Sequence, residues 1–390
     1  MNFDDVIDRK GSHCAKWDLM EENYGVPAEQ GIAMWVADMD FRPPQVIREA
    51  LQAVLDHGFF GYFGDESAYL SAIEWWMKTR HNWQIEPEWI FSTHGLVNGT
   101  AMCIDAFSQP GDGIMIMTPV YHAFARIIRA SNRDLIECEL QNTNGRYELN
   151  IEAWESQLKG HERILLLCSP HNPGGRVWTK QELQAIAAFS KRHDLILVSD
   201  EIHHDLVFPE KTHVPMATAD PSICDRLVMM TAGTKTFNIA GTHCGNVIIP
   251  DPKLRHRFAL RMSALGLSPN SFGLFATTAA YSAAGAQWVD ALMRYLDESR
   301  MIFDDRVNAV TGLRSMPLEA TYLSWVDFSQ TGLPIADVIA RIETTAKIAV
   351  NHGSTFGKGG EMFMRFNIAT PRSIMCEALD RLEIAFQDLC

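Results

Sequence analysis

Short apolar runs alternate with amphipathic stretches over residues 90–250, and this alternation limits the fold more than any other feature of the sequence. The runs "GIMIMTP", "RILLLCSP", "LILVSDE" and "RLVMMTAG" have the length and composition of buried strands. The stretch from about residue 121 and the run "TKQELQAIAAFSKRH" have helical spacing. Strands that alternate with helices predict an α/β fold whose large domain holds a mainly parallel, doubly wound sheet.

The pattern differs at the two ends of the chain, which predicts three parts. Residues 1–45 are expected to form an extended arm that ends at two prolines. Residues 46–280 are expected to form the large domain, beginning with the helical run "QVIREALQAVLDHG". A long helical run, "QWVDALMRYLDESRMIFDDRVNAV", then leads into a smaller α+β domain of residues 281–390, which the arm is expected to join.

Charge and cysteine usage argue against several classes of protein. The formal net charge of -14 does not suit nucleic acid or an acidic membrane surface as a partner. No apolar run reaches the length of a membrane span, and the acidic N-terminal stretch predicts no signal peptide. The eight scattered cysteines contain no Cys-x-x-Cys pair, which is typical of reduced thiols in a cytoplasmic protein.

Polar residues follow three of the predicted strands. Asn172 comes after "LLLCSP", Asp200 ends "LILVSD", and Lys235 comes after "LVMMTAGT". Each has an ordinary explanation when taken alone: a turn, a helix cap or a solvated lysine. Ligands of doubly wound sheets bind outside the carboxyl ends of the strands, so the three side chains are expected to face one cleft.

These three residue types suit a cofactor that is both a pyridine and an aldehyde. A carboxylate beside the pyridine nitrogen keeps it protonated and makes the ring an electron sink, while a lysine can hold the aldehyde as a Schiff base. An asparagine amide can donate to the phenolate oxygen of the ring. No metal site is predicted, because His203 and His204 have no second ligand pair at metal spacing.

The chain resembles the fold-type I pyridoxal-phosphate enzymes of the class I/II aminotransferase superfamily, and within them the cystathionine β-lyase (C–S lyase) subfamily. The matching stretches lie between residues 35 and 372 and include "WVADMDF", "TPVYHAF", "CSPHNPGGRVWTKQEL", "SDEIHHDL", "GTKTFNIAG" and "MRFNIATPR". The resemblance implies the aspartate aminotransferase-like fold and pyridoxal 5'-phosphate (PLP) as cofactor. It also implies an amino-acid substrate and a homodimer with shared active sites.

The resemblance assigns roles to the residues that match the family's motifs. Lys235 corresponds to the lysine that bonds the cofactor, Asp200 to the partner of the ring nitrogen, and Tyr121 to the aromatic residue stacked on the ring. These three are expected to be catalytic. Arg365 corresponds to the arginine that binds the substrate α-carboxylate, and Asn172 to a residue that contacts both this group and the ring oxygen. The other cofactor contacts are expected from His203, Thr234, the backbone amides of Gly95, Leu96 and Val97, and the Tyr62 side chain of a neighbouring subunit.

Two departures from the family pattern bear on the reaction. His243 stands where most aminotransferases carry an arginine that pairs with the phosphate, and Ala232 stands where Ser or Thr is usual. The lyase subfamily also tends to lack that arginine. The resemblance therefore favours a C–S β-lyase that yields pyruvate, ammonia and a thiol. The alternative is an aminotransferase acting on a small amino acid, which would use the same residues.

Two other functions fit the sequence less well. An aminotransferase-like sensor with a DNA-binding head would need a helix-turn-helix domain, whereas the resemblance already begins at residue 35. A nicotinamide dehydrogenase would need Gly-x-Gly-x-x-Gly after a strand, which this sequence does not contain.

Overall fold

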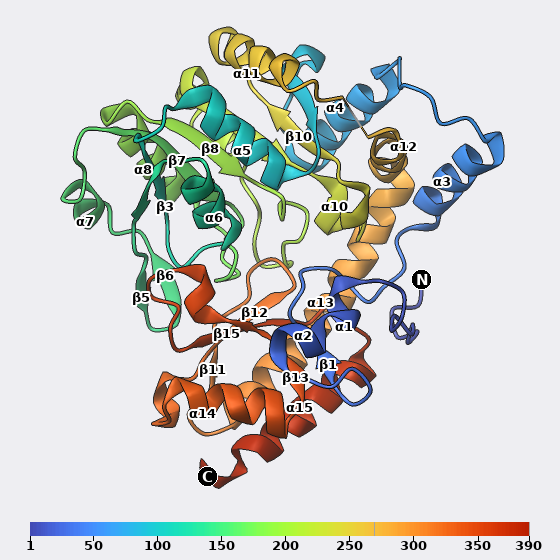
Figure 1. Ribbon diagram of the computed structural model, residues 1–390, viewed down its shortest axis with the longest axis vertical. Helices are drawn as coiled ribbons and strands as arrows, with labels where there is room; N and C mark the ends of the chain where they lie inside the picture. Colours follow the sequence, from blue (N-terminus) through green and yellow to red (C-terminus); the bar gives the residue numbers. More distant parts are fainter. Residues whose placement is uncertain (269, 390) are drawn as a thin grey trace.

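The computed structural model describes residues 1–268 and 270–389, which form a larger and a smaller body around two separate sheets (Figure 1). The larger body holds a seven-stranded sheet of order β2-β10-β9-β8-β7-β3-β4. Its neighbouring strands are parallel, except that β10 runs antiparallel to β2 and β9, so the prediction of a mainly parallel sheet is confirmed. The strands are β2 (Ile90–Thr93), β3 (Gly113–Ile116), β4 (Asp134–Glu137), β7 (Glu162–Cys168), β8 (Ile196–Asp200), β9 (Leu227–Thr231) and β10 (Gly245–Ile248).

Apolar side chains cover both faces of this sheet. Ile164 and Leu166 of β7 belong to one apolar cluster, together with residues of α5, α6 and α11. Leu165 and Leu167 belong to a second cluster, which includes residues of α4, α8, α12 and α13. Since successive side chains of a strand point to opposite faces, burial on both faces explains why the strands are continuous apolar runs. The helices are α4 (Ser67–His81), α5 (Leu96–Phe107), α6 (Ala123–Ala130), α8 (Lys180–Arg192), α11 (Pro252–Ala264), α12 (Ser271–Ala280) and α13 (Ala283–Ala309).

Two of the predicted helices have clear capping residues at one end. The helix α3 (Gln45–His57) ends at Gly58, whose φ of 73° is a left-handed conformation that glycine adopts readily. The helix α8 begins with a capping box, in which the side chains of Thr179 and Glu182 each accept a hydrogen bond from the other residue's backbone amide. The long helical run predicted after residue 286 lies in α13 as far as Ala309, and its last residue, Val310, is the C-cap.

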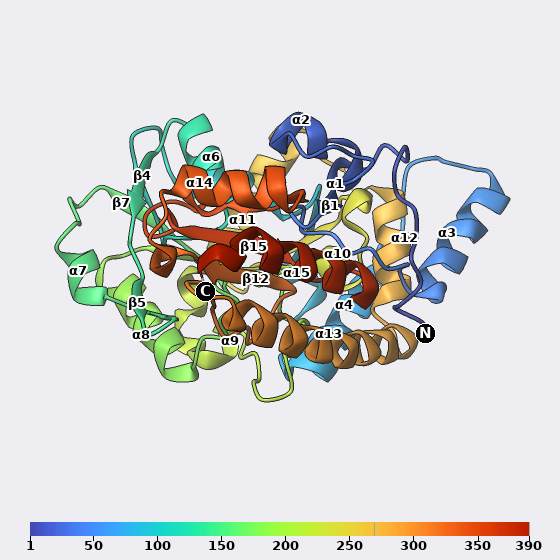
Figure 2. The same ribbon diagram turned by 90° about the horizontal axis from the view of Figure 1, so that it is seen from below.

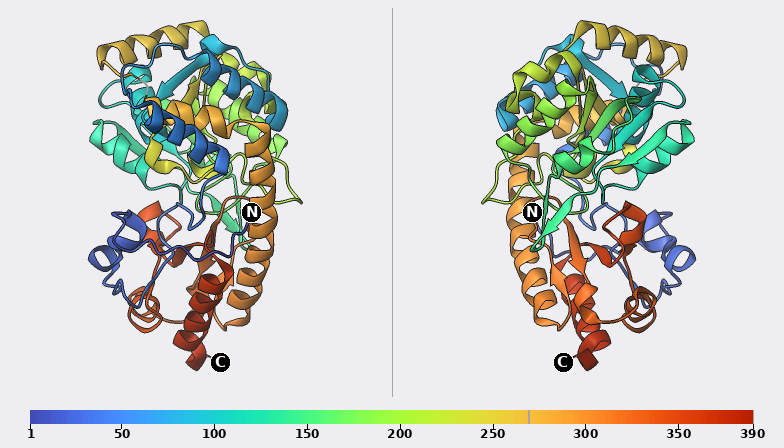
Figure 3. Two further views of the ribbon diagram at one scale, coloured as in Figure 1. Left: turned by 90° about the vertical axis from the view of Figure 1, so that its right-hand side faces the viewer. Right: turned by 90° about the vertical axis from the view of Figure 1, so that its left-hand side faces the viewer.

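The smaller body contains a four-stranded antiparallel sheet of order β11-β12-β15-β14. Seen from below, this sheet lies among α13, α14 and α15 (Figure 2). The helix α13 runs from the larger body along the smaller one and links the two (Figure 3). The other elements are β11 (Arg314–Ser315), β12 (Leu323–Asp327), β14 (Asn351–His352), β15 (Phe363–Asn367), α14 (Ile335–Ala340) and α15 (Arg372–Phe386).

The N-terminal residues are less extended than the sequence suggested. Two short helices, α1 and α2, precede the strand β1, which pairs in parallel with β13 of the smaller body. Trp17 and Met20 of these helices are buried in one apolar cluster with residues of β1 and β13. Such short helices are stabilised by tertiary packing, which local spacing does not reveal. The elements are α1 (Ala15–Asp18), α2 (Met20–Tyr24), β1 (Ile32–Ala33) and β13 (Ile348–Ala349).

Residues 36–41 form a strap that both bodies hold. Asn367 of β15 donates hydrogen bonds to two of its carbonyl groups, and Asn238 of the larger body donates to two others. Asp40 is buried within the strap and accepts a hydrogen bond from the Lys16 amine at 2.7 Å. The strap is therefore fixed by side chains that are far apart in the sequence.

Two further findings bear on the class of protein. Over residues 1–268 and 270–389, the structure contains no helix that is both long enough and apolar enough to cross a membrane. Seven of the eight cysteines lie in this part of the chain, and all seven are free thiols. The eighth, Cys390, lies outside the described residues.

Candidate active site

A cavity of about 550 Å³ lies at the carboxyl ends of the central strands. Its walls come from the larger body, from α2 and residues 35–37 of the N-terminal part, and from β14, β15 and Thr355 of the smaller body. This position is the one that ligands take in doubly wound sheets. The predicted site residues that line the cavity are Leu96, Val97, Tyr121, Asn172, Asp200, His203, Lys235 and Arg365.

Three predicted site residues are not part of this lining in the described chain. Gly95 is the N-cap of α5, directly before two residues that do line the cavity. Thr234 is buried next to Lys235. Tyr62 is fully exposed to solvent. Its expected contact with a neighbouring subunit's cofactor stays a prediction.

Lys235 lies in the short helix α10 (Gly233–Thr236), which follows β9. Its Nζ donates a hydrogen bond to the carbonyl oxygen of Ala37 in the strap, at 2.7 Å. Burial and the nearby Arg365 guanidinium lower the pKa of Lys235 to about 8. An amine with this pKa is partly deprotonated near neutral pH, so it can attack a carbonyl or accept a proton.

Asp200 ends β8 and is buried. One of its oxygens accepts a hydrogen bond from the Ile202 amide at 3.1 Å, and no side chain of the described residues forms an ion pair with it. Burial raises the pKa of Asp200 to about 7. A buried carboxylate without a cation favours a ligand that carries a proton toward it, as a protonated pyridine nitrogen does.

His203 also lines this cavity. Its Nδ1 is buried and has no hydrogen-bond partner among the described residues. Burial and the charges of Lys235 and Arg365 hold the pKa of His203 well below its usual range, so the ring is neutral. A neutral imidazole has one donor and one acceptor nitrogen, so the His203 ring can hydrogen-bond a ligand atom in the cavity.

Arg365 reaches the cavity from β15 and is buried. It donates to Oδ1 of Asn172 at 3.1 Å, to the carbonyl of Trp35 at 3.0 Å and to the side chain of Asn351. All three partners are neutral, and the Arg365 Nε has none among the described residues. Burial lowers the pKa of this guanidinium to about 10. A buried guanidinium without an anion is suited to bind a ligand carboxylate through two hydrogen bonds.

Tyr121 and the start of α5 complete the geometry expected for an aromatic phosphate ester. Tyr121 follows β3, and its amide donates to the carbonyl of Asn172 at 3.1 Å, which ties two strand ends together. Its ring lines the cavity and can stack on an aromatic ligand. The first amides of α5, at Leu96 and Val97, have no partner within the helix and can bind phosphate oxygens. His243, at the family's arginine position, also lines the cavity.

Several site residues were not identified from the sequence. The carbonyl of Ala37 accepts hydrogen bonds from both Lys235 and Tyr322, at 2.7 and 3.0 Å. Asn351 holds Arg365, and Tyr24 and His122 line the cavity. The stretch "WVADMDF", which matches the family, covers the strap and could have pointed to Ala37. No sequence motif pointed to Asn351 as a site residue, because only the packing of the smaller body brings it to the cavity.

Comparison with known proteins agrees with this geometry. The profile of the family described as "Aminotransferase class I and II" matches residues 31–382. The chain belongs to this aminotransferase family. The resemblance inferred from the sequence and the aspartate aminotransferase-like fold are thereby confirmed.

Among members of the family, the chain is similar to proteins named as lyases. It is 36% identical to cystathionine beta-lyase PatB of Bacillus subtilis, over 99% of this chain and 100% of that protein. It is 32% identical to protein MalY of Escherichia coli, over 95% of each chain. The crystal structure of cystalysin from Treponema denticola, which contains a PLP cofactor, superposes with a TM-score of 0.95 at 36% identity, over 100% of this chain and 99% of that one.

Asp200→Asn should stabilise the protein once any cofactor has been removed. The pKa of Asp200 is about 7 in the fold, against about 3.9 in an unfolded chain. The folded state therefore loses stability as the pH rises through this window, and the loss is complete above it. Asparagine carries no charge to bury. We expect the cofactor-free variant to unfold at a higher temperature than the cofactor-free wild type at pH 8, with the difference shrinking toward pH 5.

The matched control is Asp56→Asn, which changes an exposed carboxylate of α3 and should leave the unfolding temperature unchanged at both pH values. Addition of PLP should reverse the order, because a protonated ring nitrogen gives Asp200 the cation it lacks. If the cofactor-free Asp200→Asn protein is no more stable than wild type at pH 8, Asp200 is not an uncompensated buried charge.

Proposed function

We propose that this chain is a PLP-dependent carbon–sulfur β-lyase that cleaves cystathionine or related S-substituted cysteines to pyruvate, ammonia and a thiol. The observation that carries the proposal is the arrangement of Lys235, Asp200 and Arg365 around one cavity. The environment of Lys235 suits reaction with a carbonyl, that of Asp200 suits a protonated pyridine nitrogen, and that of Arg365 suits a carboxylate. The names of the relatives agree with this proposal, since PatB is a cystathionine beta-lyase and cystalysin contains PLP.

The residues present fit the cofactor. Lys235 would hold its aldehyde carbon, Asp200 its ring nitrogen, and Tyr121 one face of its ring. Bound there, PLP supplies an electron sink for the negative charge that develops on the substrate Cα. The remaining contacts would come from His203 and Asn172 at the phenolate oxygen, and from Gly95, Leu96, Val97 and Thr234 at the phosphate.

Arg365 and Lys235 act on different groups of the substrate. Arg365 binds the α-carboxylate with two parallel hydrogen bonds, which orients the amino acid and fixes its Cα. The Nζ of Lys235 accepts the proton from Cα, and its lowered pKa suits a base that works near neutral pH. With a sulfur substituent on Cβ, the electron pair left at Cα expels the thiolate. Water then converts the released enamine to pyruvate and ammonia.

The rest of the cavity favours a thioether over a second carboxylate. Aromatic side chains of Tyr24, Trp35 and Phe124 line it. His122 also lines it, but burial and the charge of Arg365 lower its pKa to about 4, so it is neutral at pH 7. A thioether carries little hydration to lose in such a pocket, whereas a carboxylate carries much.

No second arginine of the described residues lines the cavity. Arg261 could have served a distal acid, but it pairs with Asp105 on α5 at 2.6 Å. Arg126 does not line the cavity either. An aminotransferase for a small amino acid is the alternative, because it would use Lys235, Asp200 and Arg365 in the same way.

The state of assembly and the location are part of the proposal. Tyr62 and its neighbours Phe59 and Phe60 are exposed in one loop, and a second copy of the chain would cover them. This supports a homodimer in which Tyr62 completes the neighbouring phosphate site. The pairing of β1 with β13 supports a division into an arm of residues 1–45, a large domain of residues 46–280 and a small domain of residues 281–390. The seven free thiols support a cytoplasmic enzyme.

Cystathionine or S-methylcysteine should yield pyruvate and a thiol in equal amounts, with no 2-oxo acid added. Aspartate and glutamate should be poor amino donors, because Arg365 binds the α-carboxylate and no second arginine within residues 1–268 and 270–389 lines the cavity to receive a distal one. The measurement follows pyruvate and free thiol from the purified enzyme, with and without a 2-oxo acid. Turnover that requires the 2-oxo acid and releases no thiol would replace the lyase by the aminotransferase alternative.

Mixing two inactive variants tests whether the active sites are shared. Lys235→Ala removes the catalytic amine, and Tyr62→Phe removes a hydroxyl that is expected to act in the neighbouring subunit. In a heterodimer of the two, one site carries both changes and the other carries neither. We expect the mixture to recover up to about a quarter of wild-type activity by random pairing. Demonstrated subunit exchange without any recovery would contradict shared sites.

A further inference from the structure

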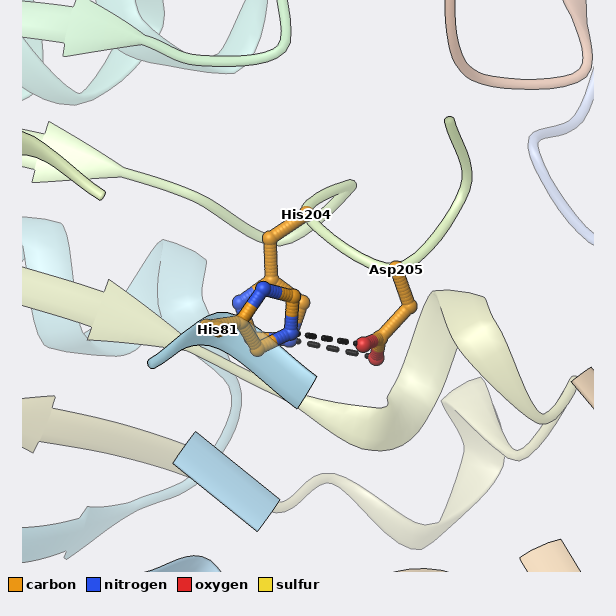
Figure 4. A group of neighbouring side chains, drawn as sticks. All are labelled: His81, His204 and Asp205. Atoms are coloured by element: carbon orange, nitrogen blue, oxygen red, sulfur yellow. Dashed lines mark hydrogen bonds and ion pairs between the residues drawn. The ribbon is translucent and has the colours of Figure 1, made fainter. Parts of the chain in front are cut away.

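A carboxylate with three hydrogen-bond donors lies beside the turn that carries Lys235. Asp205, in the loop after β8, is buried together with His204 and the last residue of α4, His81. Figure 4 shows the two imidazole rings next to each other, with an interaction from each to the Asp205 carboxylate. The ring centroids are 4.2 Å apart. We call these residues, with the donors Trp76 and Thr236, the Asp205 cluster.

Oδ1 of Asp205 has two hydrogen-bond donors, and Oδ2 has one donor together with an ion-pair contact to His204. Oδ1 lies 2.9 Å from the Nε1 of Trp76 and 2.8 Å from the Nε2 of His81. Oδ2 lies 2.8 Å from the hydroxyl of Thr236 and 3.1 Å from the Nε2 of His204. His204 lies at ion-pair distance but outside hydrogen-bond geometry, so hydrogen bonds fill three of the roughly four acceptor positions of the carboxylate. Burial opposes ionisation, yet the two histidines hold the pKa of Asp205 well below its usual range.

The same distances favour protons over a metal ion in this cluster. Zinc with imidazole and carboxylate ligands at about 2.0–2.1 Å would hold the nitrogen and oxygen atoms about 3.3 Å apart. The observed separations of 2.8 and 3.1 Å are those of hydrogen bonds and charge-assisted pairs. The carboxylate therefore serves to join protein segments: α4, the loop after β8, and α10.

The connection to α10 is the one that concerns catalysis. Within Gly233–Thr236, the described side chains make two hydrogen bonds to the rest of the chain. One runs from Lys235 to the Ala37 carbonyl, and the other from Thr236 to Asp205. The first must break whenever the Lys235 amine moves to react. The second then remains as the side-chain hydrogen bond that holds this single helical turn.

We propose that Asp205 is a positioning residue of the active site, which fixes the turn carrying Lys235 through the Thr236 hydroxyl and so sets where the Lys235 amine accepts the substrate proton. The inference rests on the proposed function, because it assigns Lys235 the role of base. It concerns the chemical step and not substrate binding, since the cluster does not line the cavity. Loss of the hydroxyl should therefore lower kcat and leave KM nearly unchanged.

Thr236→Val tests this in the holoenzyme, because it removes the hydroxyl and keeps the shape of the side chain. We expect kcat to fall about tenfold to a hundredfold, as for a misplaced catalytic group, with KM changed less than about twofold. The visible circular dichroism of the bound cofactor should weaken, because the cofactor follows the lysine that holds it. Thr236→Ser keeps the hydroxyl and should restore kcat and the dichroism to within about twofold of wild type.

The matched control is Thr278→Val, which removes a hydroxyl that donates to the Leu274 carbonyl within α12 and should change neither kcat nor the dichroism. Asp205→Asn should reproduce the dichroism change of Thr236→Val. If Asp205→Asn does not fold, the comparison of Thr236→Val with Thr236→Ser still tests the proposal. A Thr236→Val enzyme with wild-type kcat and dichroism would overturn the proposal, as would equal losses in the Val and Ser variants. The dichroism needs no substrate, so a failed lyase assay would count against the proposed function alone.

Discussion

Three ionisable side chains face one cavity without neutralising one another, and the rest of the structure is arranged around this constraint. Lys235 rests on a carbonyl oxygen, Arg365 is held by two amides and a carbonyl, and Asp200 accepts a hydrogen bond from a backbone amide. Burying charged groups without counterions costs free energy that the remainder of the fold must offset. A site that leaves these groups unpaired is built to pair them with a ligand, and PLP with an amino acid supplies all three partners.

The fold holds these groups in place from two bodies at once. Parallel strands bring Asn172, Asp200 and Lys235 to one edge of the large sheet, while Arg365 comes from the smaller sheet. The strap of residues 36–41 lies between them and receives the Lys235 amine at Ala37. The cavity therefore exists only where the two bodies meet. Its apolar walls, and the neutral state of His122, direct it toward a thioether and away from a second acid.

Much of this could be predicted because parallel strands end at one edge. The alternation of strands and helices predicted the sheet, and the polar residues after three strands predicted Asn172, Asp200 and Lys235 as one group. The roles of Tyr121 and Arg365 came only from the family resemblance. Asn351, the helices α1 and α2, and the contact of His81 with Asp205 depend on tertiary packing between distant segments, which no local pattern records. The contact expected of Tyr62 and the domain boundaries stay predictions.

In the proposed function, Lys235 bonds the cofactor and acts as the base. The most direct test of this proposal is borohydride reduction of the yellow holoenzyme, followed by digestion and mass mapping of the labelled peptide. Reduction makes the bond between PLP and its lysine permanent, so the label identifies that residue without any assumption about substrate. We expect the reduced cofactor to be attached to the peptide that contains Lys235, with one cofactor label per chain. A label on any other lysine would contradict the account.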